Sequence, residues 1–326
     1  MVITKTPFRM SFFGGGTDIE EYFKTAGGAV LSTTIDKYCY VTVRHLPPFF
    51  DYKSEIAYAQ IERIQEIDEI QHPMVRNAMK MLDMKDLRIT YEGDLPARSG
   101  LGTSSSFAVG LLNAFYCLNG KYADKKKLAD EAIYLERVLC DEAGGWQDQI
   151  AASYGGLNRI DFSGNGYEVR PIIISSQRKK ELSDNLVMLF TGFTRFSSEM
   201  QEKNKITKDT SKLDELKKLV DQAESILEND NVSVDEFGRL MDYTWKIKRT
   251  TGQKVTTNTI DELYDRGMKA GALGGKLLGA GGGGFMVFYV QPEKRAGFMK
   301  EMDNLLEIPF NFEDGGTLVV HYVPED

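Results

Sequence analysis

A glycine-rich turn followed by four consecutive hydroxyl residues is the segment of this sequence best suited to chemistry. Gly100 and Gly102 stand directly before an apolar stretch that can form a helix. Such a turn leaves backbone N–H groups unpaired at the positive end of the helix, and both features favour a bound phosphate. The hydroxyls add hydrogen-bond donors and ligands for Mg²⁺. The predicted phosphate loop contains Pro96, Arg98, Ser99, Gly100, Leu101, Gly102, Thr103, Ser104, Ser105 and Ser106.

Two other interpretations of this loop fit its sequence less well. It is not a Walker A loop, because no Lys-Ser or Lys-Thr pair follows the glycines. It could instead be a plain helix N-cap with surplus serines, but a cap needs only one of the four hydroxyls.

A second glycine run lies near the C-terminus and leads into the apolar stretch Phe285–Val290. Its spacing formally matches GxGxxG, but a dinucleotide-binding fingerprint follows a strand and opens a helix. This context is missing here, which argues against an NAD-dependent oxidoreductase. We predict instead a loop between two strands that closes over a nucleotide, formed by Gly279, Ala280, Gly281, Gly282, Gly283 and Gly284.

Four charged residues could act beside these loops. Glu136 falls on the apolar stripe of a helix predicted over residues 124–140, where a carboxylate needs a metal ion, a buried Arg or Lys, or a catalytic role. Asp148 follows a Gly-Gly turn near the start of another helix, and helix capping is its alternative role. Arg9 and Asp18 lie in a turn-rich N-terminal stretch and, taken alone, would form surface salt bridges.

Composition limits the class of protein. The 326 residues carry 40 Lys and Arg against 48 Asp and Glu, and the resulting net charge of −8 argues against general nucleic-acid binding. No apolar run reaches the roughly 18 residues of a membrane span, and the N-terminus lacks the pattern of a signal peptide. The three cysteines, an odd number at wide spacing, fit a reducing compartment. The three histidines are scattered, which argues against a His/Cys zinc site. We therefore expect a cytoplasmic protein with neither a membrane nor a nucleic-acid partner.

Strand-like and helix-like segments must position these residues, and they do not alternate strictly along the chain. Residues 87–92 have the alternation of a half-buried strand, and residues 185–190 have the apolar run of a buried one. Apolar residues over 213–227 follow helical spacing. We predict the α+β class rather than a doubly wound parallel sheet, with two domains over residues 1–170 and 171–326.

Together these segments resemble the GHMP kinase superfamily, which includes galactokinase, homoserine kinase, mevalonate kinase and phosphomevalonate kinase. Three motifs occur in the expected order, over residues 6–18, 96–106 and 276–285. The resemblance implies a ribosomal-S5-like N-terminal domain and a ferredoxin-like C-terminal domain, with ATP between them. It also implies that ATP and Mg²⁺ are the cofactors.

The resemblance further implies a role for individual residues. Asp148 would be the catalytic carboxylate that faces the substrate hydroxyl, with Arg9 orienting it and stabilising charge. Ser104 and Glu136 would hold Mg²⁺. Asp18 matches a sugar-contacting acid, and the substrate-binding segment would be formed by Gly15, Gly16, Thr17 and Asp18.

The N-terminal motif departs from that of galactokinases. It reads Phe-Phe-Gly-Gly-Gly-Thr-Asp, without the Glu and His of Gly-Glu-His-Thr-Asp. It is similar to the motif of D-glycero-D-manno-heptose 7-phosphate kinases, which phosphorylate an anomeric hydroxyl on the route to GDP-activated heptose for surface polysaccharide. The implied substrate is therefore a small sugar phosphate. The alternatives are a fucokinase-like, galactokinase-like or mevalonate-type kinase, or a sugar and nucleotide sensor without turnover. The sequence leaves open whether the protein forms a homo-oligomer.

A phosphorylated sugar requires cations in a chain of net negative charge, because its phosphate carries close to two negative charges. The basic residues near the motifs are Lys5, Arg44, Arg98, Lys246, Arg249 and Lys276. We predict that at least one cation from Arg44 or from residues 246–249 receives the substrate phosphate. Lys276 directly precedes the glycine run and is the candidate for a role with ATP instead.

Overall fold

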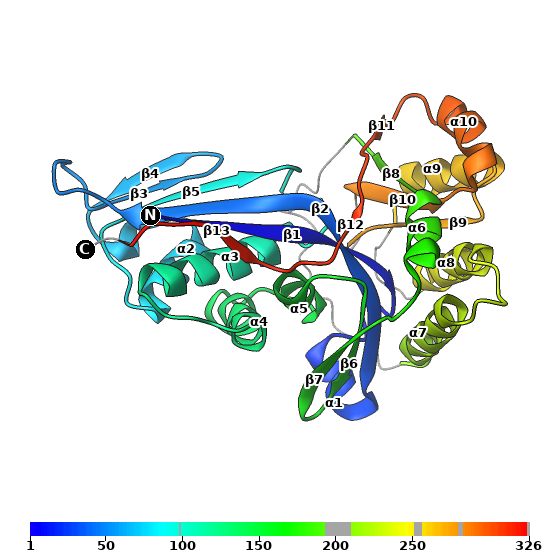
Figure 1. Cartoon of the computed structure of the whole chain (residues 1–326), viewed down its shortest axis with the longest axis horizontal. Helices are drawn as coiled ribbons and strands as arrows, with labels where there is room; N and C mark the ends of the chain where they lie inside the picture. Colours follow the sequence, from blue (N-terminus) through cyan, green and yellow to red (C-terminus); the bar gives the residue numbers. More distant parts are fainter. Residues whose placement is uncertain (98, 193–209, 251–255, 280–282, 325–326) are drawn as a thin grey trace.

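The computed structural model describes residues 1–97, 99–192, 210–250, 256–279 and 283–324, which build two β-sheets flanked by helices (Figure 1). Nine of the described strands form the larger sheet, whose main path is β13-β1-β2-β5-β3-β4. Its centre is a long antiparallel pair, and β3 joins β5 in parallel. The strands are β1 (Val2–Phe13), β2 (Gly28–His45), β3 (Ser54–Ala57), β4 (Ile61–Ile64), β5 (Leu87–Gly93), β6 (Asn158–Ser163) and β7 (Gly166–Pro171), with β12 and β13 from the C-terminus.

Helices cover one face of the larger sheet, and α3 lies at their centre (Figure 1). Because α3 is apolar nearly all round, it is buried between the sheet and its neighbouring helices. These helices are α2 (Pro73–Met81), α3 (Thr103–Leu118), α4 (Lys125–Tyr134) and α5 (Gln147–Tyr154), while α1 (Glu20–Ala26) and the short 3₁₀ turn η1 (Ile67–Glu69) lie in connections.

The second sheet is antiparallel, with the order β11-β8-β10-β9. Every residue of β9 and β10 is buried, because helices pack against these strands. Its strands are β8 (Leu186–Phe190), β9 (Gly274–Leu277), β10 (Phe285–Tyr289) and β11 (Leu306–Glu307). The helices beside it are α6 (Ser176–Asp184), α7 (Ser211–Glu228), α8 (Asp235–Lys248), α9 (Asn258–Lys269) and α10 (Pro292–Glu301). The predicted strands, the amphipathic helix over 213–227 and the α+β class are confirmed.

The end of the chain returns to the larger sheet, where β12 (Phe312–Glu313) pairs with β2 and β13 (Leu318–Tyr322) pairs with β1. The two halves also share a core. The ring of Phe237 on α8 meets those of Phe12 and Phe13 edge-on, at centroid distances of 5.2 and 4.9 Å. The division into residues 1–170 and 171–326 stays a prediction. Among the described helices, none has the length and apolar character needed to cross a membrane.

The helix predicted over residues 124–140 is interrupted. The α-helical part, α4, ends at Tyr134, and a single π-helical turn, η2 (Leu135–Leu139), follows it. Apolar periodicity does not distinguish an α-turn from the slightly wider π-turn, so the sequence pattern could not reveal this change. Such π-turns occur frequently at functional sites, and this one carries Glu136.

Candidate active site

Arg9 and Asp148 form a bidentate ion pair between β1 and the first turn of α5. Nε and Nη2 of Arg9 donate to the two carboxylate oxygens of Asp148 at 2.7 and 2.8 Å. Nη1 of Arg9 donates to the carbonyl oxygen of Gly100 at 2.7 Å. The Arg9 side chain is 5% exposed and that of Asp148 is 23% exposed, so the pair is not a surface salt bridge. The carboxylate is therefore held in a fixed plane while part of it faces solvent.

The predicted phosphate loop lies directly beside this pair. Gly102 is the N-cap of α3 in a left-handed conformation, and no side chain caps the helix. Ser106 donates to the carbonyl oxygen of Pro7 at 2.8 Å instead. A Cβ atom added to Gly102 would lie 3.4 Å from Oδ2 of Asp148. The uncapped first turn of α3 thus provides backbone N–H groups for an anion next to the Asp148 carboxylate.

The two glycine segments pack against each other, backbone on backbone. A Cβ atom on Gly100 would lie 2.3 Å from the carbonyl oxygen of Leu278, and one on Gly284 would lie 2.1 Å from that of Ser99. The run connects β9 to β10, as predicted. Of the predicted residues, Arg98, Ala280, Gly281 and Gly282 lie outside the described part of the chain, and Pro96 is exposed at the start of the loop.

Glu136 is 1% exposed, which confirms that it points inward. It accepts hydrogen bonds from the Ser105 hydroxyl at 2.7 Å and from the Gln149 amide. Burial raises the pKa of this carboxyl, and the nearby Arg137 charge opposes the rise. No described cation forms an ion pair with Glu136, so the buried Arg or Lys of the alternative interpretation is not found among the described residues. The predicted partner Ser104 lies in the same turn and is exposed.

The oxygen atoms around Glu136 are suitable ligands for Mg²⁺. Carboxylate, hydroxyl and amide oxygens are the hard ligands that Mg²⁺ prefers, and Oε1 of Gln149 is buried without a hydrogen-bond partner in the described structure. The described residues contain no cluster of three or more His, Cys, Asp or Glu side chains able to hold a metal. Mg²⁺ commonly binds through one or two carboxylates together with substrate phosphates, so one buried carboxylate beside a phosphate loop is compatible with it.

Asp18 is buried beside the N-terminus of α5. Its carboxylate accepts from the backbone N–H groups of Gly16 at 2.9 Å and Gln147 at 3.2 Å. Burial raises the pKa of Asp18, partly offset by the hydrogen bond from Gly16. A Cβ atom on Gly145 would lie 1.9 Å from the Asp18 carboxylate, so a larger residue there would displace Asp18. Thr17 is fully buried, and its hydroxyl is bonded to the backbone.

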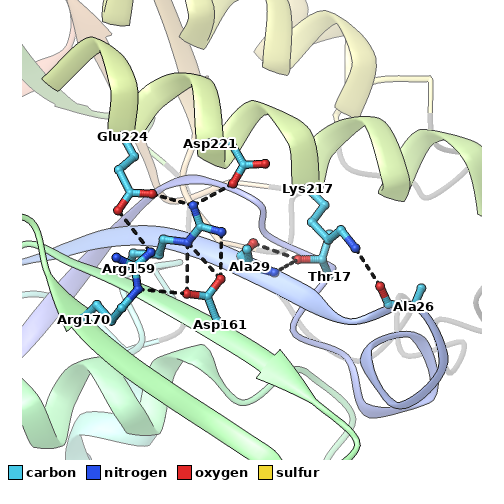
Figure 2. A network of polar contacts seen from close by, with 9 residues as sticks. All are labelled: Thr17, Ala26, Ala29, Arg159, Asp161, Arg170, Lys217, Asp221 and Glu224. Carbon is cyan, nitrogen blue, oxygen red and sulfur yellow. Dashed lines mark hydrogen bonds and ion pairs between the residues drawn. The ribbon is translucent and has the colours of Figure 1, made fainter. Parts of the chain in front are cut away.

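An ion-pair network, which sequence reasoning missed, joins β6 to α7 beside this N-terminal segment (Figure 2). Arg159 on β6 reaches across to α7, where it pairs with Asp221 at 2.6 Å and Glu224 at 2.5 Å. Lys217 of α7 donates to the carbonyl oxygen of Ala26 at 2.6 Å. Helix α7 is thereby fixed to the segment that follows Asp18. Only the fold brings these residues together, so no local motif could have revealed the network.

The candidate cations for a substrate phosphate lie in different places. Lys246 pairs with Asp242, and Arg249 pairs with Asp261. Thr34 of β2 is the residue paired with Arg9 of β1 in the sheet. Arg44 lies ten residues further along β2, a distance of about 33 Å along the strand. Lys5 lies over the ring of Tyr38.

Two lysines lie at the site itself. Lys276 is buried and donates to the carbonyl oxygens of Ser11 and Phe12 at 2.8 and 2.9 Å. Lys248 falls inside the predicted range 246–249, and its ammonium lies beside Gly15.

Comparisons with known proteins agree with this arrangement. The model described as GHMP kinases N terminal domain matches residues 70–156, and that described as GHMP kinases C terminal matches residues 212–302. A D-glycero-alpha-D-manno-heptose 7-phosphate kinase from Campylobacter jejuni is 30% identical over 319 residues, covering 92% of each chain. The bifunctional fucokinase/GDP-fucose pyrophosphorylase of Arabidopsis thaliana is 29% identical over 71% of this chain, which spans 22% of that protein.

A solved structure has the same fold over nearly the whole chain. The D-glycero-D-manno-heptose 1-phosphate kinase from Bacteroides thetaiotaomicron superposes with a TM-score of 0.80 at 26% identity, covering 99% of this chain and 100% of that one. The predicted two-domain GHMP fold is thereby confirmed. Because both family models match in order and a relative of 30% identity covers almost the full length, this chain belongs to the GHMP kinase family and is an ATP-dependent kinase.

Proposed function

We propose that this kinase phosphorylates the anomeric hydroxyl of D-glycero-D-manno-heptose 7-phosphate, giving the 1,7-bisphosphate for nucleotide-activated heptose synthesis. The observation that carries the proposal is the position of the Arg9–Asp148 pair. It lies between the uncapped end of α3 at Gly102 and the buried acid Asp18. The Campylobacter jejuni relative supports the choice of sugar.

Asp148 acts on the sugar hydroxyl in this proposal. Arg9 uses two N–H groups to fix the plane of the carboxylate, which leaves lone pairs on both oxygens for the hydroxyl proton. Its third contact, to the carbonyl oxygen of Gly100, ties the guanidinium to the phosphate loop. Arg9 is therefore placed to meet negative charge as it develops during transfer. Positioning and charge neutralisation supply most of the acceleration in phosphoryl transfer.

The nucleotide phosphates bind at the first turn of α3, with the glycine run covering them. Glu136 and Ser104 hold Mg²⁺, and the Ser105 hydroxyl keeps the Glu136 carboxylate in place. When bound, Mg²⁺ neutralises charge on the β- and γ-phosphates. Asp18 faces the sugar, held by the N–H groups of Gly16 and Gln147.

A fucokinase-like activity is the second candidate, because the Arabidopsis thaliana relative is 29% identical over 71% of the chain. A panel of sugars and sugar phosphates assayed by ADP release distinguishes the candidates, and NMR then identifies the phosphorylated carbon. The proposal predicts the highest kcat/KM for heptose 7-phosphate and a product phosphorylated at the anomeric carbon. Preference for fucose would favour the second candidate, and no ADP release with any sugar would favour a sensor.

A further inference from the structure

Three hydrogen-bond donors from three different elements face one point beside Gly15. The point is where a Cβ atom would stand on this glycine. Nζ of Lys248 lies 3.4 Å from it, and Nε2 of Gln147 and Oγ of Ser11 each lie 3.7 Å from it. The donors come from the end of α8, the first turn of α5 and the end of β1. Gly15 itself is partly exposed.

One of these donors is unsatisfied among the described residues. Ser11 is 6% exposed, and its hydroxyl has no hydrogen-bond partner within the described structure. A buried hydroxyl without a partner is destabilising unless a bound group completes its hydrogen bonds. The Ser11 hydroxyl therefore points to a ligand at Gly15.

The charges around the point favour an anion. The Lys276 ammonium is held on the carbonyl oxygens of Ser11 and Phe12, at the same end of β1. Burial lowers the pKa of Lys276 well below its usual value, and the nearby charges of Lys248 and Arg9 lower it further. A bound anion would favour the charged form of Lys276 and so oppose this lowering of its pKa.

The two carboxylates of the site are already held by other donors. Asp18 accepts from the N–H groups of Gly16 and Gln147, and Asp148 accepts from Arg9. Their charge is therefore partly compensated, which lowers the cost of bringing an anion to Gly15.

We propose that the donors beside Gly15 bind the phosphate monoester that the sugar substrate already carries. This inference rests on the proposed function and adds the subsite that selects a phosphorylated sugar. Gln147 directly precedes Asp148 in α5, so one helical turn supplies both the catalytic carboxylate and a donor of the subsite. One sugar can therefore present its hydroxyl to Asp148 and its phosphate to Gly15.

Substitution of Gly15 by alanine tests the subsite without removing a charge. Gly15 has no left-handed φ, and the added methyl group would have neighbours no closer than 3.4 Å, so the variant should fold. The methyl group would occupy the point that the donors face. Gly297→Ala on α10 is the matched control, because no atom lies within 4 Å of its added Cβ.

The readout is the ratio of kcat/KM for heptose 7-phosphate to kcat/KM for the unphosphorylated heptose. We expect a ratio of about 100 in the wild type, a plausible yield of charge-assisted contacts, and about 10 or less in Gly15→Ala. Lys248→Gln should lower the ratio in the same direction, and Gly297→Ala should keep it. An unchanged ratio in Gly15→Ala overturns the subsite. A raised KM for ATP with an unchanged ratio also overturns it, because the donors would then serve the nucleotide.

Failure of the proposed function gives a different result, namely no turnover of either heptose. The subsite is then tested with inorganic phosphate, titrated by calorimetry into the enzyme saturated with Mg²⁺ and a non-hydrolysable ATP analogue. Affinity that is at least about fivefold weaker in Gly15→Ala than in Gly297→Ala supports an anion site. Equal affinity in the two variants overturns it.

Discussion

Gly100 and Gly279 pack backbone against backbone, so that a Cβ atom on Gly279 would lie 2.4 Å from the Cα of Gly100. Gly279 also has a φ of 80°, at which an alanine costs about 1–2 kcal/mol. We predict that Gly279→Ala displaces the glycine run from the phosphate loop and raises the KM for ATP roughly tenfold or more, the equivalent of ~1.4 kcal/mol. Gly164→Ala, in an open hairpin turn, should leave this KM unchanged. An unchanged KM in Gly279→Ala would separate the run from nucleotide binding.

Removing the charge of Glu136 should affect the metal requirement rather than the fold. Glu136→Gln is expected to raise the Mg²⁺ concentration for half-maximal activity. Its Tm without Mg²⁺ should equal or exceed that of the wild type, because no described cation loses a partner and a buried charge disappears. Glu168→Gln, at an exposed position on β7, is the control. A lower Tm with an unchanged Mg²⁺ dependence would assign Glu136 a structural role.

Asp18 should make stability depend on pH. Burial raises its pKa above 3.8, so its contribution to stability is fully present below the unfolded-state pKa and is lost as pH rises through the raised folded-state pKa. Asp18→Asn does not titrate. The Tm of Asp18→Asn relative to the wild type should therefore increase as pH rises from about 4 through that pKa, whatever its offset. A difference in Tm that is constant over this range would show that the carboxyl is not perturbed.

The network in Figure 2 should stabilise the packing of α7 beside β6. Arg159→Ala removes the shorter of the two ion pairs of Glu224 and leaves only that with Arg170 at 3.2 Å among the described residues; Arg159 and Glu224 are largely buried, at 15% and 12% exposure. We expect a loss of about 2–3 kcal/mol in the free energy of unfolding measured in urea, less than the full cost of breaking a fully buried pair. Arg239→Ala removes an exposed pair with Glu236 and should cost less than about 1 kcal/mol. Similar losses in the two variants would mean that the network contributes little.

Features encoded in short stretches of sequence could be predicted. The glycine-rich turn before α3, the glycine run between β9 and β10 and the inward position of Glu136 all follow from local composition and periodicity. The family followed from the order of these motifs, and the α+β class followed from the lack of strict alternation between strand-like and helix-like segments. The roles assigned to individual site residues stay predictions.

Features that depend on tertiary contacts could not be predicted. Ser11, Gln147 and Lys248 meet at one point only because the ends of β1 and α8 and the start of α5 come together. The same holds for the partners of Arg159 on α7. Ser105, and not Ser104, donates to Glu136 because of the rotational position of α3 about its own axis. A run of four consecutive hydroxyl residues does not reveal which of them faces Glu136.

The most direct test of the account is the turnover of Asp148→Asn with saturating ATP and heptose 7-phosphate. The amide keeps the size of the side chain but cannot accept the sugar proton. The account predicts a fall in kcat of roughly 10²–10⁴, with the affinity for ATP retained in a separate binding measurement. A kcat close to that of the wild type would contradict the central claim that Asp148, held by Arg9, acts on the attacking hydroxyl.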